Sequence, residues 1–249
     1  MEQSGLHISL AAEKLGTFFG MPITNSFVTE IIVMVLVMVT VFFARRKIAM
    51  VPGKVQTAVE SMFEISLQFF EQTFESRSLA VKFFPFLATI FIFIAACNLF
   101  DFLPIVGSVG IHHGGEFVPF LRPANTDLNM TLALAIVAVI AIEVIGIISI
   151  GFFRYSARFF TLKSPVAFVV GLIEFMSELS RFVSFSFRLF GNIFAGEVLL
   201  AIAGFFMPYF LPVPIMAFET FVGIIQAAVF AMLTLFFIKL AITDQHAAH

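Results

Sequence analysis

Charged and polar side chains recur within apolar stretches of this sequence, where hydropathy alone would exclude them. Arg188 lies in the longest such stretch, with Ser184 and Asn192 four residues to either side of it. Residues spaced by three or four lie on one face of a helix, and Ser177 and Arg181 continue this polar stripe. Arginine stays cationic inside proteins and cannot itself relay protons. It can hold an anionic carboxylate and separate two aqueous paths, which is chemistry suited to ion transfer.

Carboxylates in the same stretches are candidates for proton exchange. Glu174 lies on the stripe of Arg188, and Glu219 is followed at helical spacing by Gln226. Glu197 stands nine residues beyond the arginine, about 13 Å along a helix axis. A charge at the bilayer centre costs about 2.5–3.5 kcal/mol, so such groups usually face the protein interior or water and mark an ion path. Further acids in or beside apolar stretches are Glu30, Glu143 and Glu178.

Structural ion pairs are the alternative interpretation of these charges. Arg188 could form a salt bridge with a buried glutamate and have no part in transport. Arg181 is expected to be structural, paired with Glu174, Glu178 or a lipid phosphate. The stripe favours a functional role for Arg188, because intramembrane charges are functional candidates by default.

The composition indicates an integral membrane protein. Of 249 residues, 60% are hydrophobic and only 12% are charged, whereas soluble domains carry about a quarter charged residues. The mean hydropathy is +1.06.

The net charge of −2 argues against a nucleic-acid partner. The single cysteine, Cys97, excludes an intrachain disulfide and is expected to be a small buried apolar residue. We find no motif for a metal, a cofactor, a phosphate loop or a nucleophilic catalytic pair.

Five apolar stretches are long enough to cross a bilayer, which takes about 20 residues per helix. They cover residues 27–44, 83–103, 128–153, 165–206 and 215–242. The fourth would be about 60 Å long as one helix, twice a bilayer core. It must tilt, bend or leave the membrane, and Gly191 and Gly196 are possible weak points. Pro208, Pro212 and Pro214 predict a turn before the fifth stretch.

The remaining segments complete a single all-α membrane domain. Residues 54–75 alternate apolar and acidic positions with helical spacing, which predicts an amphipathic helix at the interface or covering other helices. Residues 1–26 lack the pattern of a signal peptide and are expected to form a weakly amphipathic segment at the outer surface.

The distribution of basic residues predicts the orientation of the chain. Six Lys and Arg residues lie between Arg45 and Lys82, and three more between Arg154 and Lys163. The loop of residues 101–127 has only Arg122. Basic loops remain in the cytoplasm, so we expect the N-terminus outside and the C-terminus inside.

Four motifs in order resemble subunit a of F-type ATP synthases. Residues 184–197 read SFSFRLFGNIFAGE, and the last stretch reads IIQAAVFAMLTLFFIKLAI from Ile224. The second span reads PFLATIFIFIAACNLFDFLPI from Pro85, and the entry to the third reads RPANTDLNMTLAL from Arg122. The first 80 residues match that family only in layout.

The resemblance implies a role for each polar position. Arg188 would be the stator arginine that meets the ionised carboxylate of each rotor-ring subunit, and the two long helices would form a tilted hairpin against that ring. The outer proton path would comprise Asn192, Glu197, Glu219 and Gln226. The cytoplasmic path would comprise Glu174, Ser177, Ser180 and Ser184. Some members have a histidine where this chain has Glu219, so here Glu197 and Glu219 would titrate as a coupled pair.

The same resemblance implies the activity and the partners. Protons would pass through two offset half-channels to and from the rotor carboxylates, which couples the proton-motive force to rotation and ATP synthesis by a non-catalytic subunit without cofactors. Expected partners are the rotor c-ring, peripheral-stalk b-type subunits, the remaining ATP synthase subunits and membrane lipids, in a bacterial inner membrane. A secondary transporter should show an inverted repeat, and we find none. A purely structural anchor with inert acids, and sodium as the coupling ion, remain open at this point.

Overall fold

The computed structural model describes residues 12–18, 21–103, 105–113, 116–159 and 165–243. In this part of the chain five helices are long and apolar enough to cross a membrane, which confirms the expected all-α membrane class. They are α1 (Asn25–Arg46), α3 (Arg77–Phe100), α4 (Leu128–Ile150), α6 (Pro165–Phe206) and α7 (Pro212–Ile242). Between them lie α2 (Lys54–Phe74), the short α5 (Phe152–Phe159) and one turn of 3₁₀ helix, η1 (Ala124–Thr126).

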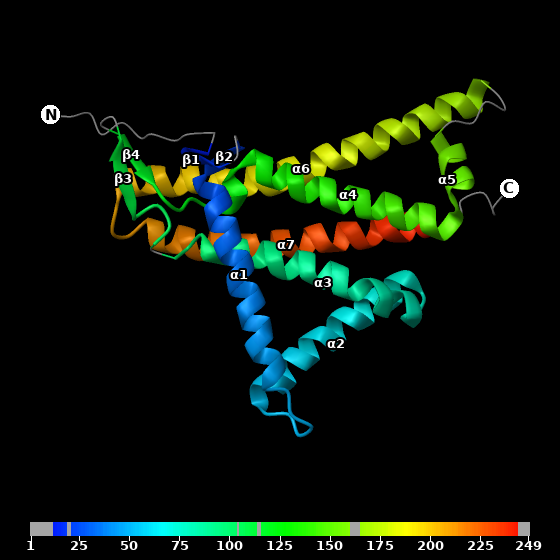
Figure 1. The fold of residues 1–249 in the computed structure, drawn as a ribbon, viewed down its shortest axis with the longest axis horizontal. Helices are drawn as coiled ribbons and strands as arrows, with labels where there is room; N and C mark the ends of the chain where they lie inside the picture. Colours follow the sequence, from blue (N-terminus) through cyan, green and yellow to red (C-terminus); the bar gives the residue numbers. More distant parts are fainter. Residues whose placement is uncertain (1–11, 19–20, 104, 114–115, 160–164, 244–249) are drawn as a thin grey trace.

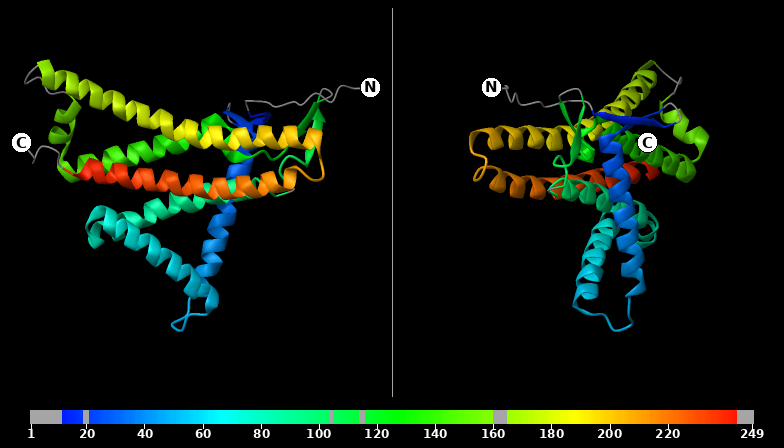
Figure 2. Two further views of the ribbon diagram at one scale, coloured as in Figure 1. Left: turned by 180° about the vertical axis from the view of Figure 1, so that it is seen from behind. Right: turned by 60° about the vertical axis from the view of Figure 1, so that its left-hand side comes forward.

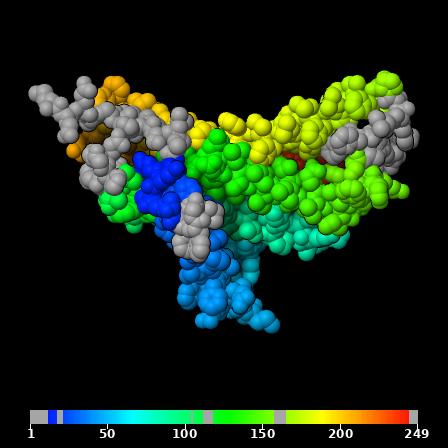
Figure 3. All heavy atoms as spheres, turned by 45° about the horizontal axis from the view of Figure 1, so that its top comes forward, coloured from blue at the N-terminus to red at the C-terminus, as the bar shows by residue number. Residues whose placement is uncertain are grey.

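The helices α6 and α7 form an antiparallel hairpin that runs the length of the molecule (Figure 1). The helix α3 packs on α7, and α4 packs on both members of the hairpin. The helix α1 crosses this bundle steeply and contacts it through α3 and η1, while its far end and the start of α2 extend away from it (Figure 2). In the space-filling view, these two helices project from the wide body that the others form (Figure 3).

Two small β-hairpins lie at the end of the bundle where α1 begins, and we call this the β end. Strand β1 (Lys14–Phe18) pairs with β2 (Met21–Thr24), and β3 (Gly110–His113) pairs with β4 (Glu116–Pro119), both antiparallel. The first hairpin lies within residues 1–26, expected as a weakly amphipathic segment at the outer surface, of which residues 1–11 and 19–20 lie outside the described part of the chain. Its Gly16 and Pro22 disfavour a helix, which is why a strand pair is the better local structure.

The helix α6 is continuous over 42 residues, so Gly191 and Gly196 do not break it as the sequence suggested they could. A glycine inside a helix costs only about 1 kcal/mol relative to alanine, and packing against α4 and α7 outweighs that cost. The helix instead changes direction gradually along its length (Figure 2). The expected turn falls between Phe206 and Pro212, where α7 begins with proline.

The core is formed by apolar side chains that α3, α4, α6 and α7 direct toward one another. At the level of Phe185, the rings of Phe185 and Phe230 lie 4.7 Å apart between α6 and α7. Buried alanines of α4 and α7 let the helices approach closely, as is common in membrane bundles. Cys97 is fully buried in a cluster near the β end, which confirms the expectation for the lone thiol. The amphipathic helix α2 covers α3 through Phe70 and Phe74.

Candidate functional site

A cavity of about 240 Å³ lies near the β end, between α3, η1, α6 and α7. Most of its wall is apolar, but polar residues contribute from all four elements. These are Asn98, Asp101, Thr126, Asn192, Glu197 and Glu219. The cavity therefore brings together Asn192, Glu197 and Glu219, three of the four residues that the sequence analysis assigned to one proton path. Gln226, the fourth, is buried on α7 but is not part of the cavity wall.

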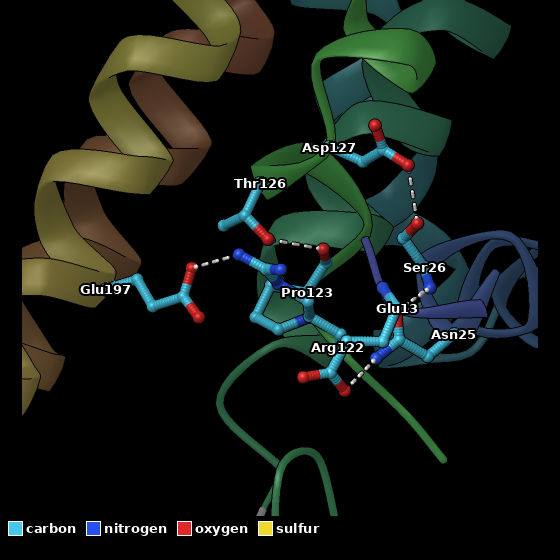
Figure 4. Close-up of polar contacts among 8 residues, drawn as sticks. All are labelled: Glu13, Asn25, Ser26, Arg122, Pro123, Thr126, Asp127 and Glu197. Carbon is cyan, nitrogen blue, oxygen red and sulfur yellow. Dashed lines mark hydrogen bonds and ion pairs between the residues drawn. The ribbon is translucent and has the colours of Figure 1, made fainter. Parts of the chain in front are cut away.

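Glu197 forms an ion pair with a residue that the sequence analysis left without a role. Arg122 approaches it from the segment that precedes η1, and its Nη2 lies 3.4 Å from Glu197 Oε2. The arginine side chain is only 8% exposed, against 32% for the glutamate. Figure 4 shows the two side chains reaching toward each other from α6 and from the turn before η1. A buried guanidinium is stable in such a place only when a carboxylate compensates it.

Glu219 reaches the same cavity from α7 but has different neighbours. Its Oε1 is buried and has no hydrogen-bond partner among the described residues. The carboxylate lies against Gly196 of α6, where a Cβ atom would collide with it. The absence of a side chain at Gly196 thus makes the space that the carboxylate occupies. The two glutamates share one cavity, and only Glu197 has a cationic partner in the described part of the chain.

A buried amide network adjoins the cavity. Asn98 Nδ2 donates to the backbone oxygen of Gly223 at 2.8 Å, and Asn125 Nδ2 donates to Asn98 Oδ1 at 2.6 Å. The Nε2 of Gln226 is buried one turn further along α7 without a hydrogen-bond partner in the described residues. The carboxylate oxygens of Asp101 are also buried, near the backbone N–H of Ala124. Polar groups therefore continue from the cavity into the helix contact of α3 and α7.

Arg188 lies outside the cavity, on a face of α6 that points away from the core of this chain. The residue is exposed, and its Nη2 donates to Ser184 Oγ at 3.1 Å. The described residues supply no ion pair to this guanidinium. Val183 and Phe187 are also exposed, whereas Phe185 and Leu189 of the adjacent face are buried. Next to Arg188, the exposed face of α6 thus carries large apolar side chains together with Ser184.

The residues assigned to the cytoplasmic path lie along α6 on the far side of Arg188 from the cavity. Ser177, Ser180 and Ser184 are exposed, and Glu174 is partly buried. Ser180 Oγ donates back to the Met176 carbonyl, and Ser184 accepts the bond from Arg188. These residues share a helix face, as their spacing predicted, but the cavity does not include them.

Arg181 has the structural role expected for it. Its Nη1 lies 2.6 Å from Glu178 Oε1, one helical turn earlier. Its guanidinium also stacks 4.3 Å from the ring centre of Phe237 on α7. Arg181 therefore joins α6 to α7 while Glu178 compensates its charge.

Five polar residues at or near the cavity were not assigned by the sequence analysis, namely Asn98, Asp101, Arg122, Asn125 and Thr126. Three of them carried a signal. Asn98 and Asp101 are three residues apart at the end of an apolar span, hence on one helix face. Arg122 is the only Lys or Arg within residues 101–127. Asn125 and Thr126 lie in the single turn of η1, which is too short for residue spacing to indicate the direction of a side chain.

Comparisons with known proteins agree with this architecture. The model of the family described as the ATP synthase A chain matches residues 27–239. The ATP synthase subunit a of Moorella thermoacetica is 33% identical over 87% of this chain and 90% of its own length. That of Campylobacter concisus is 31% identical over 88% and 89%. A protein of Propionigenium modestum named ATP synthase subunit a, sodium ion specific, is 28% identical over 94% and 79%. The chain therefore belongs to the family of ATP synthase subunit a.

Proposed function

We propose that this chain carries protons to and from a rotor ring through two offset half-channels that Arg188 separates. On the outer side, protons enter through the cavity of Asn192, Glu197 and Glu219 and continue past Gln226. On the cytoplasmic side, they leave along Glu174, Ser177, Ser180 and Ser184. The chain couples the proton-motive force to rotation without catalysing ATP formation itself. Family membership places the chain in an ATP synthase, and the two half-channels and the role of Arg188 are proposed in addition.

The exposed position of Arg188 is the observation that carries this proposal. A guanidinium on an apolar helix face within the membrane needs an anionic partner or water. The described part of the chain supplies none by ion pairing. A carboxylate on a neighbouring rotor subunit is a partner of the right charge, and it could leave again as the ring turns. Once neutralised by a proton, that carboxyl could face lipid, which its charged form could not do without a large cost.

The separation along α6 supports two paths rather than one pore. Glu197 lies nine residues beyond Arg188, about 13 Å along the helix. The serines lie on the other side of the arginine. A fixed positive charge between two wet regions repels protons that would cross directly. Each proton then crosses only with the ring, and each charge yields about 2.3 kcal/mol per 100 mV of potential.

We infer that the partners are a rotor c-ring on the exposed face of α6, b-type stalk subunits, the other ATP synthase subunits and lipids. The setting is a bacterial inner membrane, with the N-terminus outside and the C-terminus in the cytoplasm.

Sodium is a second candidate for the coupling ion, because the Propionigenium modestum relative is named sodium ion specific. Proton coupling predicts ATP synthesis that is independent of sodium concentration, whereas sodium coupling predicts synthesis that requires it.

The proposal is tested by replacing Arg188 in the assembled complex in membrane vesicles. We expect Arg188→Ala to abolish ATP synthesis driven by an imposed proton gradient. Arg77→Ala is the matched control, because Arg77 is 59% exposed and pairs only with acids of α2 among the described residues. Copurification of the rotor ring with each variant shows that assembly is intact. Proton-driven synthesis by an assembled Arg188→Ala complex would contradict the proposal.

A further inference from the structure

Arg122 lies beside the cavity, is basic, and belongs to neither proposed proton path. Its side chain is buried against Glu197, nine residues from the exposed Arg188. Removing one partner of a buried ion pair leaves an uncompensated charge, which is costly. Loss of either side chain of the Arg122–Glu197 pair would therefore leave the other charge uncompensated beside the cavity.

Arg122 is held from its backbone by the start of α1. Its N–H donates to Thr29 Oγ1 at 3.2 Å, and Thr29 is fully buried. On one side of it, Asn25 Nδ2 donates to the carbonyl of Pro119 at 3.2 Å. On the other side, Ser26 Oγ donates to Asp127 Oδ2 at 2.7 Å.

Figure 4 shows two of these contacts, that of Ser26 with Asp127 and that of Arg122 with Glu197. Both ends of the segment 119–127 are thus attached to the first turns of α1. The backbone of this segment is thus held by α1, while the guanidinium of Arg122 pairs with Glu197 of α6.

The two glutamates of the cavity have unequal electrostatic surroundings. Glu197 faces the guanidinium of Arg122, whereas Glu219 Oε1 is buried without a hydrogen-bond partner among the described residues. Two carboxylates that share a site without a counter-ion cannot both ionise readily, and they then behave as one coupled pair. A cation fixed beside one of the two carboxylates favours the ionised form of that one, so the two acids are no longer equivalent.

We propose that Arg122 is a positioning residue that holds Glu197 as a fixed anion and leaves Glu219 as the acid that exchanges protons at this cavity. This inference rests on the proposed function and gives the two acids different parts in it. Arg122 touches no transported proton itself. It acts through Glu197, whose constant negative charge attracts incoming protons toward Glu219.

The test is a double-mutant cycle between Arg122 and Glu197, measured as proton-driven ATP synthesis per assembled complex. We expect Arg122→Gln to lower the rate by about tenfold or more, because it leaves the Glu197 charge without its counter-ion. Glu197→Gln should have a milder effect. In the Arg122→Gln background, Glu197→Gln should cause no further loss and should recover part of the rate. Glu219→Gln should abolish synthesis in every background.

Three further variants separate this role from a merely structural one. Arg122→Lys keeps the charge and should recover most of the activity. Arg77→Gln, which disrupts an exposed pair, should match the original chain. If Arg122→Gln fails to assemble, recovery of assembly by the added Glu197→Gln supports the inference, and failure to recover contradicts it.

Two other results would overturn the inference. One is that the losses from Arg122→Gln and Glu197→Gln simply multiply. The other is that Arg122→Lys is as inactive as Arg122→Gln. An active Arg188→Ala complex in the same vesicles would instead show that the proposed function itself is wrong. If the Arg188→Ala complex is inactive and the losses from Arg122→Gln and Glu197→Gln multiply, only the role proposed for Arg122 is excluded.

Discussion

At the residue scale, the space for the Glu219 carboxylate depends on a missing side chain. Gly196→Ala should displace that carboxylate, because the added Cβ would occupy its place. A shift of about 1 Å at a reacting group can lower a rate by about a hundredfold. We therefore expect the rate of proton-driven synthesis to fall by about tenfold to a hundredfold. The complex should still assemble.

Gly204→Ala is the matched control for this change. It lies on the same helix, and an added Cβ there meets nothing within 4 Å. It should leave synthesis unchanged or raise stability slightly, because alanine favours a helix. Equal rates for the two alanine variants would show that the contact of Gly196 with Glu219 has no functional importance.

The sequence predicted the polar cavity residues of α6 and α7, and missed those that α3 and the segment before α4 contribute. Asn192, Glu197 and Glu219 could be grouped because helical periodicity relates positions on one helix and the resemblance relates the helices. The Arg122 to Glu197 contact joins residues 75 positions apart. Its geometry depends on how the segment 119–127 folds against α1, and no periodic pattern encodes that.

At the element scale, Arg181 links α6 to α7 through its stacking on Phe237. Arg181→Gln should remove its stacking on Phe237 and leave Glu178 without its cation. We expect a loss of about 1–2 kcal/mol in the free energy of unfolding, from the cation–π contact and the charged hydrogen bond together. Denaturant titration of the purified chain in mixed micelles measures this. A double-mutant cycle with Phe237→Leu should show coupling, and zero coupling would mean that the stacking adds nothing.

A second element-scale contact ties the end of α2 to α7 and should depend on pH. The hydrogen bond from Lys239 to Glu75, at 2.8 Å, and the charge of that lysine lower the pKa of Glu75. A lowered carboxyl pKa stabilises the fold above the pKa of the unfolded chain, about 4.3. That contribution disappears as pH falls through the folded pKa.

The expected result is a pH-dependent effect of Lys239→Gln. At pH 7 the variant should melt at a slightly lower temperature than the original chain, and this difference should become smaller as the pH is lowered toward 3. The effect should also shrink at high salt, because Glu75 is exposed and its interactions are screened. Lys54→Gln, at the other end of α2, is the control. A difference that persists unchanged at pH 3 would exclude the Glu75 charge as its cause.

The α6 helix shows why element boundaries were easier to predict than element shape. Apolar length and the proline cluster gave the ends of α6 and α7 within a few residues. Whether glycines would interrupt α6 depended on packing against α4 and α7, which local sequence does not reveal. The β1–β2 hairpin was missed for a related reason, since a short segment rich in glycine and proline has no periodicity to read.

At the scale of the whole molecule, the cavity and the exposed serines Ser177, Ser180 and Ser184 lie on opposite sides of Arg188 along α6. Vectorial transport therefore requires that the β end face one side of the membrane and the basic loops face the other. The loop between α1 and α2 follows the basic cluster Arg45, Arg46 and Lys47, and the turn between α6 and α7 has no basic residue. By the distribution of positive charge, the first should be cytoplasmic and the second should be outside.

Single cysteines can test this orientation directly, because the native Cys97 is 0% exposed and should not react. Met50 and Tyr209 are 102% and 96% exposed in these two connections. In intact cells, a membrane-impermeant maleimide should label Tyr209→Cys and leave Met50→Cys unlabelled, and inverted vesicles should show the opposite. The original chain should remain unlabelled in both. Labelling of Met50→Cys from outside would reverse the orientation, and the acidic cavity would then belong to the cytoplasmic path.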